Sequence, residues 1–414
     1  MCFATVLALS LGSYMTLCYR TLELSSRTMQ STRGLELAET GMEEALWSLN
    51  KNSWTDWSLS GTTATRTIGG FTFDNGATGS VSLTVTNYNG SLPANRTVTV
   101  TGTVTQADGK VLNRTLTSES VKAPLFVNAV AATTGRVRFR SGGSVDSYDS
   151  SLGAYDAPGF PPGFSAVISS ASSGSNVPIQ LTNAQIKGYV SSYWESGPSF
   201  STSARLIGPA TSPTIKIDSS RISTSPYQPI FEEVLPTGSG TTLPSGTATI
   251  GTAGATVPTL YYASEIDLDN SRTLTVDGPV VIRVYGDVFI SEGARIRVTA
   301  NGSLRLHFGG DLGIGGFGIQ NDTRVPRNVI LISTFNPYES FSISTGAAFY
   351  GVIYTPNSSL SISSSLAFYG AIVARSVNMS ASPAIHYDLA LSKVHFDGLE
   401  VPYSVSSWRE TTAQ

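Results

Sequence analysis

Three acidic residues alternate with apolar ones along the segment Glu265-Ile266-Asp267-Leu268-Asp269. Successive side chains of a strand point to opposite faces, so Glu265, Asp267 and Asp269 would share one face. Carboxylate oxygens are the ligands that Ca²⁺ prefers, which makes a calcium site one interpretation. The same alternation is typical of a half-buried strand with a solvated acidic face, and we favour that interpretation.

A second acidic group, formed by Asp146, Asp149 and Asp156, lies in a Gly/Ser-rich segment. These carboxylates are candidates either for binding calcium or for capping turns through hydrogen bonds to nearby backbone N–H groups. We favour the capping role. Apart from calcium at these two acidic groups, no metal or other cofactor is expected.

Asp287 and Asp311 offer the best enzymatic interpretation of the chain, because each follows a glycine in a similar segment. On adjacent coils their carboxyl groups would lie about 4.8 Å apart, close to the separation of about 5 Å in a retaining glycosidase. Aspartate after glycine is also a common turn residue, and no Arg or Lys is placed to stabilise a transition state. We therefore expect no enzyme and keep a carbohydrate-active enzyme as the alternative.

The three histidines, His307, His386 and His395, are too scattered to indicate a metal triad or a Ser/His/Asp arrangement. A different charged pattern is formed by Arg136, Arg138 and Arg140, which alternate with Val137 and Phe139. On a strand they would form a short basic face. That face either contacts anionic glycans or a neighbouring subunit, or is simply solvated.

Composition narrows the function classes further. The 414 residues carry a formal net charge of −3, which provides no broad cationic field for phosphate backbones, so we expect no nucleic-acid partner. The two cysteines, Cys2 and Cys18, both lie in the apolar N-terminal stretch, which leaves the rest of the chain without a disulfide or a cysteine metal site.

The N-terminal stretch has no charged residue from Met1 to Tyr19. As a helix it would extend roughly 28 Å, close to the thickness of a bilayer core, and we expect it to insert into a membrane. A helical pattern continues past Arg20 with an apolar stripe at spacings of three and four, which predicts a helix over residues 1–50 that docks on a folded domain. The stripe comprises Leu35, Ala38, Met42, Ala45 and Leu49.

Residues 51–123 show short alternating segments and the turn Ala107-Asp108-Gly109-Lys110, which predict a small antiparallel β domain. Residues 124–414 would form a second body. Its C-terminal half repeats, since Phe349-Tyr350-Gly351 recurs as Phe368-Tyr369-Gly370 after 19 residues, and Asp277-Gly278 aligns with Asn301-Gly302 after 24. Such periods predict stacked β-solenoid coils. Residues from about 150 to 258 are weakly periodic, and we expect an irregular insertion there.

Two segments resemble known families. The segment 37–46, with Ala38, Glu39, Gly41 and Ala45, resembles the end of the first helix of PilX-type minor pilins. Around Phe349–Asn357 and Phe368–Asp388, including His386, Tyr387 and Asp388, the sequence is similar to the C-terminal domain that accompanies such helices in pilus-assembly proteins. Since the chain lacks a basic leader and an acidic residue in its first apolar positions, we expect the natural start to lie upstream of Met1.

The resemblance implies a non-enzymatic, pilin-like component of the bacterial inner membrane or pilus, with an extracytoplasmic body that serves adhesion or a pilus tip. Its fold would be mainly β: a long N-terminal helix, a small antiparallel domain and a right-handed β-helix-like solenoid. Other pilins would be the partners, and a membrane-anchored module that binds a surface glycan is a further alternative. Pilin packing would use Leu7, Leu9, Leu11 and Leu17.

Overall fold

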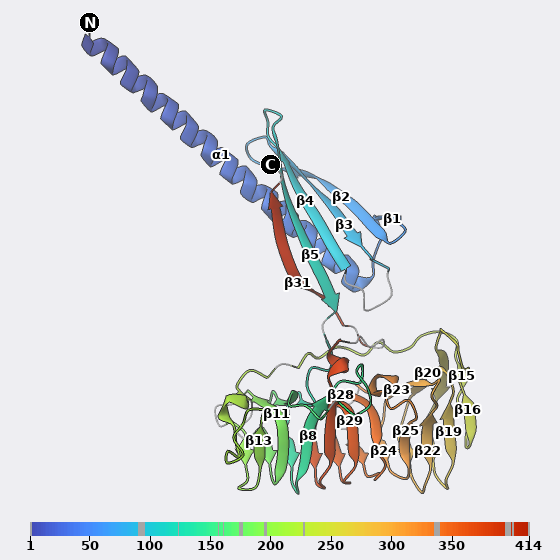
Figure 1. Cartoon of the computed structure of the whole chain (residues 1–414). Coiled ribbons are helices and arrows are strands. Elements are labelled where there is room, and N and C mark those ends of the chain that lie inside the picture. The colour runs from blue at the N-terminus through green and yellow to red at the C-terminus, as the bar shows by residue number, and fades with distance from the viewer. Residues whose placement is uncertain are drawn as a thin grey trace. The chain divides into compact units, whose positions relative to one another are not determined.

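The computed structural model describes all but a few short segments of the chain. Outside it lie Met1, residues 90–95, 123, 156, 160, 174–176, 194–196, 227, 335–339, 394–398, 400 and 413–414, and the side chains of residues 2–6, 8 and 412. The chain forms two compact units (Figure 1). The helix–sheet unit comprises Met1–Ala123 and Pro402–Gln414, and the parallel body comprises Pro124–Val401.

The helix–sheet unit consists of one long helix and a six-stranded antiparallel sheet in the order β1-β2-β3-β4-β5-β31. Alternate side chains of β4 are buried, and they pack with the second half of the helix into one core. This unit confirms the expected helix and antiparallel domain. Its elements are α1 (Cys2–Lys51), β1 (Ser58–Ser60), β2 (Thr63–Thr72), β3 (Thr78–Thr86), β4 (Arg96–Thr105), β5 (Val111–Lys122) and β31 (Tyr403–Thr412).

The C-terminal segment does not lie in the second body, where the sequence led us to expect it. Residues 402–414 belong to the helix–sheet unit and include strand β31. This strand pairs antiparallel with β5, and Tyr403 lies opposite Lys122. Residues 124–401 are therefore inserted between two neighbouring strands of one sheet. The sequence gives no sign of this pairing, because a short alternating strand does not indicate which distant strand it joins.

The parallel body is built from short strands that stack in parallel, so that each strand pairs with the equivalent strands of the coils on either side. One ladder contains β15 (Thr241–Thr242), β17 (Thr259–Ala263), β20 (Pro279–Val284), β23 (Ser303–Phe308), β26 (Val329–Ile332), β6 (Val130–Ala132), β9 (Ala166–Ser170) and β14 (Ile222–Ser223). A second contains β18 (Ile266–Leu268), β21 (Val288–Ile290), β24 (Leu312–Ile314), β27 (Ser340–Ile343), β7 (Val137–Phe139), β10 (Ile179–Leu181) and β12 (Ser199–Phe200).

A third group of strands completes the coils. It contains β16 (Ala248–Ile250), β19 (Thr273–Val276), β22 (Arg295–Val298), β25 (Gly318–Asn321), β30 (Ala384–Asp388), β8 (Gly143–Tyr148) and β13 (Arg205–Ile207). Three longer strands contribute to more than one ladder: β28 (Phe349–Ile362), β29 (Ala367–Met379) and β11 (Ala184–Ser192). Short 3₁₀ turns are η1 (Ser219–Arg221), η2 (Pro326–Asn328) and η3 (Leu389–Lys393).

The register of these ladders agrees with the repeats in the sequence. Phe349 pairs with Phe368 and Tyr350 with Tyr369, which is the offset of 19 residues. Pro279 pairs with Ser303, which is the offset of 24 residues. Apolar side chains at alternate positions point inward and are buried, as the stacking of coils requires.

The order of the coils does not follow the order of the chain. Strand β29 pairs with β6 and β7, and β30 pairs with β8, so the last coil lies directly against the first. Figure 1 shows this junction, where the red β29 stands close to the green β8. The segment 150–258, expected to be irregular, contains β9 to β16, and its weak periodicity follows from strands of only two to nine residues.

Candidate functional site

The second half of α1 packs closely against the sheet because small residues face it. Ala38 and Ala45 are fully buried, and a Cβ on Gly41 would lie 2.5 Å from methyl carbons of Val81 and Val100. A Cβ on Gly102 would lie 2.1 Å from the carbonyl oxygen of Gly34. The helix–sheet distance therefore depends on glycine at these positions, while Glu39 of the same motif is exposed.

The first half of α1 has no such cover. The large apolar side chains described between residues 7 and 24 are all at least 60% exposed. On one helix, they form a continuous run of exposed apolar side chains, which in soluble proteins marks an interaction surface. We call this surface the apolar half of α1; it comprises Leu7, Leu9, Leu11, Tyr14, Met15, Leu17, Tyr19, Leu22 and Leu24.

The expected membrane span at residues 1–19 is not supported by the residues that the structure describes. Among them, no helix is both long enough and apolar enough to cross a membrane. Ser10, Gly12, Ser13 and Thr16 dilute the apolar run, and Arg20 ends it. Met1 and the side chains of residues 2–6 and 8 lie outside the described part.

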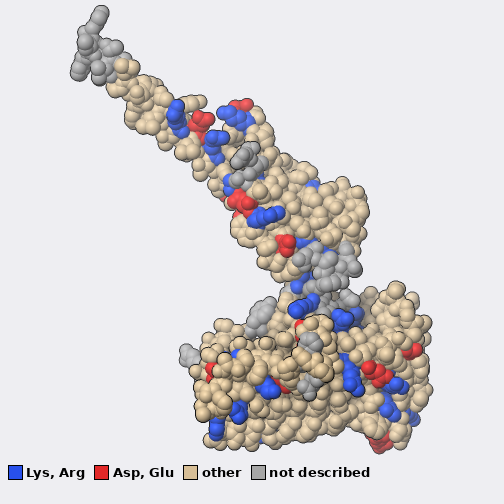
Figure 2. Space-filling model, in the orientation of Figure 1, with Lys and Arg blue, Asp and Glu red and all other residues tan. Residues whose placement is uncertain are grey.

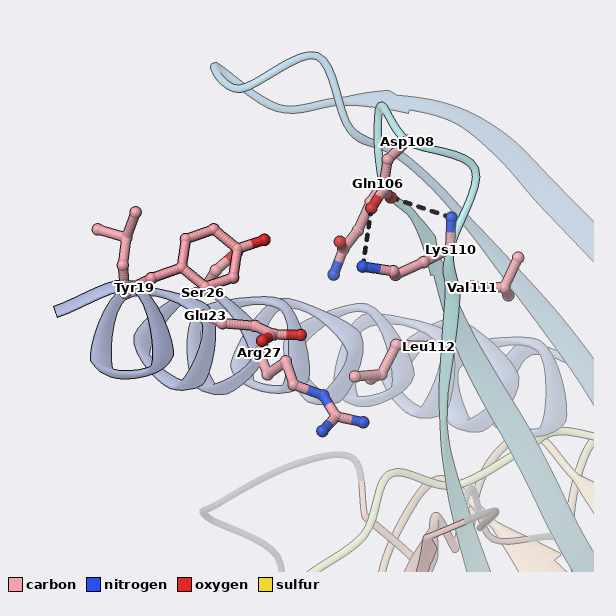
Figure 3. Close-up of a pocket in the computed structure, with 10 residues that line it drawn as sticks. Tyr19, Glu23, Ser26, Arg27, Gln106, Asp108, Lys110, Val111 and Leu112 are labelled. Atoms are coloured by element: carbon pink, nitrogen blue, oxygen red, sulfur yellow. Dashed lines mark hydrogen bonds and ion pairs between the residues drawn. The ribbon is translucent and has the colours of Figure 1, made fainter. Parts of the chain in front are cut away.

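A groove of about 530 Å³ lies where the apolar half of α1 meets the hairpin between β4 and β5 (Figure 3). On the hairpin, Lys110 donates its backbone N–H to Asp108 and also forms an ion pair with it, at 3.1 Å in each case. These contacts lower the pKa of the Asp108 carboxyl, the backbone hydrogen bond most. The groove is lined by Tyr19, Leu22, Glu23, Ser26, Arg27, Gln106, Asp108, Lys110, Val111 and Leu112.

The candidate calcium residues of the parallel body do not converge. Asp267 and Glu265 are exposed, while Asp269 pairs with Arg272 at 2.8 Å. Among the described residues, no group of three or more His, Cys, Asp or Glu is arranged to hold a metal ion. Within β18, Ile266 and Leu268 are buried and Asp267 is exposed, which is the half-buried strand that we favour from the sequence.

Asp146 and Asp149 also have separate structural partners. Asp146 Oδ1 lies 2.7 Å from His386 Nδ1, and its Oδ2 accepts a hydrogen bond of 2.8 Å from the Tyr155 hydroxyl. Asp149 accepts hydrogen bonds from the backbone N–H and the hydroxyl of Ser151. Asp156 lies outside the described residues.

The carboxylates of Asp287 and Asp311 each accept a hydrogen bond from the backbone of the coil that follows. Asp287 Oδ1 accepts the backbone N–H of Asp311 at 2.8 Å, and Asp311 Oδ1 accepts that of Ser340 at 2.7 Å. One oxygen of each carboxylate is therefore engaged by the backbone, which is the turn role that the sequence also allowed. This geometry does not favour the glycosidase interpretation.

The repeated aromatic residues stack from β28 through β29 to β30, next to the junction between the last coil and the first. Phe349 and Phe368 stack inside the body with ring centres 4.9 Å apart. Outside, Tyr350 stacks on Tyr369 at 4.2 Å, and Tyr369 stacks on His386 at 4.6 Å. Burial raises the pKa of Tyr369 to about 12, so its hydroxyl stays protonated at neutral pH. Gly370 allows the backbones of β28 and β29 to approach each other here, because a Cβ on Gly370 would lie 1.9 Å from the carbonyl oxygen of Gly351.

Polar contacts close the same junction. Asp388 accepts hydrogen bonds from the backbone N–H of Ser150 at 2.9 Å and from its hydroxyl at 2.6 Å. Burial raises the pKa of Asp388, and these hydrogen bonds oppose the shift. The Tyr387 hydroxyl donates to the carbonyl oxygen of Phe126 at 2.8 Å. We use the name junction contacts for three contacts: Asp388 with Ser150, Tyr387 with Phe126, and Asp146 with His386.

His307 and Glu233 form a buried pair that the sequence does not predict. His307 Nδ1 lies 2.6 Å from Glu233 Oε1, and both side chains are 1% exposed. Glu233 also accepts hydrogen bonds from Thr334, and Tyr354 exchanges hydrogen bonds with the backbone of Phe231. These contacts fix the connection that leads from β14 to β15. The sequence signal was absent, because Glu233 lies in a segment without periodicity. His395 lies outside the described residues.

Comparisons with known proteins add little to this geometry. Residues 209–394 match a family model described as a domain of unknown function, DUF7305. A comparison with curated proteins gives no significant match. Among solved structures, the chain is similar to the competence-associated pilin ComZ from Thermus thermophilus, with 11% identity and a TM-score of 0.24 over 93% of this chain and 98% of that one. A likeness this weak carries no argument about the present chain.

Proposed function

We propose that the chain is a non-enzymatic, pilin-like component of the bacterial cell envelope. In this proposal the apolar half of α1 packs against the equivalent helices of other pilin-like subunits. The parallel body, a right-handed β-helix, is displayed for adhesion or at a pilus tip. The resemblance of residues 37–46 to PilX-type minor pilins supports the class.

The observation that carries the proposal is the exposure of the apolar half of α1. An isolated helix with Leu9 at 69% and Leu22 at 70% exposure would cost free energy in water, because burial of each such side chain contributes about 1.5–3 kcal/mol. Packing into a bundle of similar helices would remove this surface from water. Such a role requires no catalytic residue.

Shearing surface appendages from cells of the native host tests the proposal. The chain should appear in the sheared fraction together with pilins. Leu11→Asp and Leu17→Asp should remove it from that fraction, since each places a charge in the helix bundle. Val257→Asp is the matched control, because it adds the same charge at a 74% exposed apolar residue of the body.

Two outcomes would contradict the proposal. If the unmodified chain never enters the sheared fraction, the filament role is wrong and a fixed scaffold takes its place. If Leu11→Asp and Leu17→Asp are recovered with pilins as efficiently as Val257→Asp, the apolar half of α1 is not the contact surface.

A further inference from the structure

A row of arginines stands on the outer face of the parallel body. In β7 and the residues beside it, Val137 and Phe139 are buried, while Arg136, Arg138 and Arg140 point outward. Their spacing along the strand is about 6.6 Å. Arg375 of the adjacent coil reaches the same face, where its Nη2 donates to the Ser359 hydroxyl at 3.0 Å. We call these four residues the arginine face.

The arginine face has no acidic counterpart in the part of the chain that the structure describes. None of its four guanidinium groups forms an ion pair there. Arg140 Nε instead donates to Asn378 at 2.8 Å, which is a neutral partner. Burial first, and then the charges of Arg136 and Arg140, lower the pKa of Arg138. Neutral contacts thus orient the guanidinium groups of Arg140 and Arg375 and leave their charge uncompensated.

Uncharged hydrogen-bonding side chains flank the arginine face in the strand register. Arg138 lies opposite Asn378 on one side and Gln180 on the other. Beyond Asn378, the outward positions of the next coils are Ser361 and then Ser342, and beyond Gln180 the position is Ser199. Most of the surface on the side in view in Figure 2 is likewise neither basic nor acidic.

We propose that the arginine face binds an acidic polysaccharide, with sugar carboxylates on the guanidinium groups and sugar hydroxyls on the neighbouring Ser, Asn and Gln side chains. Guanidinium groups bind carboxylates through charge-assisted, often paired hydrogen bonds. Such a polymer spreads its charges among many hydroxyls, which suits a few arginines set among neutral donors and acceptors. The polar neighbours do not suit insertion into lipid. Four arginines do not form the broad cationic field that the phosphate backbone of a nucleic acid requires.

Binding of the full chain, kept in a mild non-ionic detergent, to an oligogalacturonate tests the assignment. Arg136→Gln with Arg140→Gln should weaken binding by at least about tenfold, because two charge-assisted contacts are lost. Arg136→Lys with Arg140→Lys should retain a measurable, salt-sensitive part of the affinity. The matched control is Arg272→Gln with Arg297→Gln, which removes two charges on other coils and should bind like the unmodified chain.

Neutral dextran, phosphatidylglycerol vesicles and a DNA duplex complete the experiment. Equal binding by the two glutamine double variants, or equal binding to dextran and oligogalacturonate, would overturn the proposal. Binding to the vesicles or the duplex in preference to oligogalacturonate would assign the face to that other class. The result is independent of the filament role, because it does not require assembly with pilins.

Discussion

The helix–sheet unit and the parallel body secure their cores by different means. In the helix–sheet unit, consecutive strands pair from β1 to β5, and the helix lies close to the sheet because Gly41 and Gly102 have no side chain. In the parallel body every coil relies on its two neighbours. At the junction those neighbours are far apart in sequence, as His386 and Asp146 are separated by 240 residues. One core depends on the distance between two layers, and the other on an uninterrupted stack.

The largest effect is expected from a charge inside the stack. Phe349→Asp or Phe368→Asp would place an unpaired carboxylate among fully buried rings, at a cost of several kcal/mol. We expect the body to lose its cooperative unfolding transition, measured by circular dichroism. The helix–sheet unit should keep the fluorescence of Trp54 and Trp57.

Val257→Asp is the matched control for this prediction, because Val257 is a 74% exposed apolar residue of the same body. It should melt within about 0.5 kcal/mol of the unmodified chain, as surface substitutions usually do. Melting of Phe349→Asp and Phe368→Asp like the control would refute the stacked core.

A smaller effect is expected where α1 meets the sheet. Gly102→Ala places a methyl group against the backbone oxygen of Gly34, which cannot rotate away, so we expect about 1–3 kcal/mol of destabilisation. Denaturant unfolding followed by tryptophan fluorescence measures it, because four of the five tryptophans belong to the helix–sheet unit. Gly69→Ala is the control, since nothing lies within 4 Å of its Cβ. Equal midpoints for the two variants would show that the close contact is not required.

The smallest effect is expected from one of the junction contacts. Asp146→Asn weakens the contact with His386 and should cost about 1–3 kcal/mol, at or below the glycine effect. Hydrogen exchange should rise first in β8 and β30, the two strands that meet there. Asp149→Asn serves as the control, because among the described residues its carboxylate accepts hydrogen bonds from Ser151 alone, and the Lys393 ammonium lies 3.8 Å away. Uniform exchange across the body in both variants would contradict a local junction.

Local patterns were enough to predict the helix, the antiparallel domain and the offsets of 19 and 24 residues. Each of these features repeats within a few tens of residues, where periodicity is a direct signal. The stripe from Leu35 to Leu49 likewise faces the sheet, with Ala38 and Ala45 fully buried.

Long-range pairing was not predictable in the same way. Nothing in the sequence of β31 indicates β5, and nothing in β6 to β8 indicates β29 and β30, because strand propensity is the same for any partner. The carboxylates show the same limit. Asp146, Asp287 and Asp311 were candidate ligands or catalysts from their residue type alone, and the sequence does not indicate their backbone and histidine partners.

The place where the body is inserted has a consequence for how such chains vary. Residues 124–401 leave after β5 and return before β31, where Lys122 and Tyr403 are paired. A segment that departs and returns at one point can be exchanged by recombination without changing the strand order around it. A longer or shorter stack inserted at this point would leave the helix and the sheet unchanged.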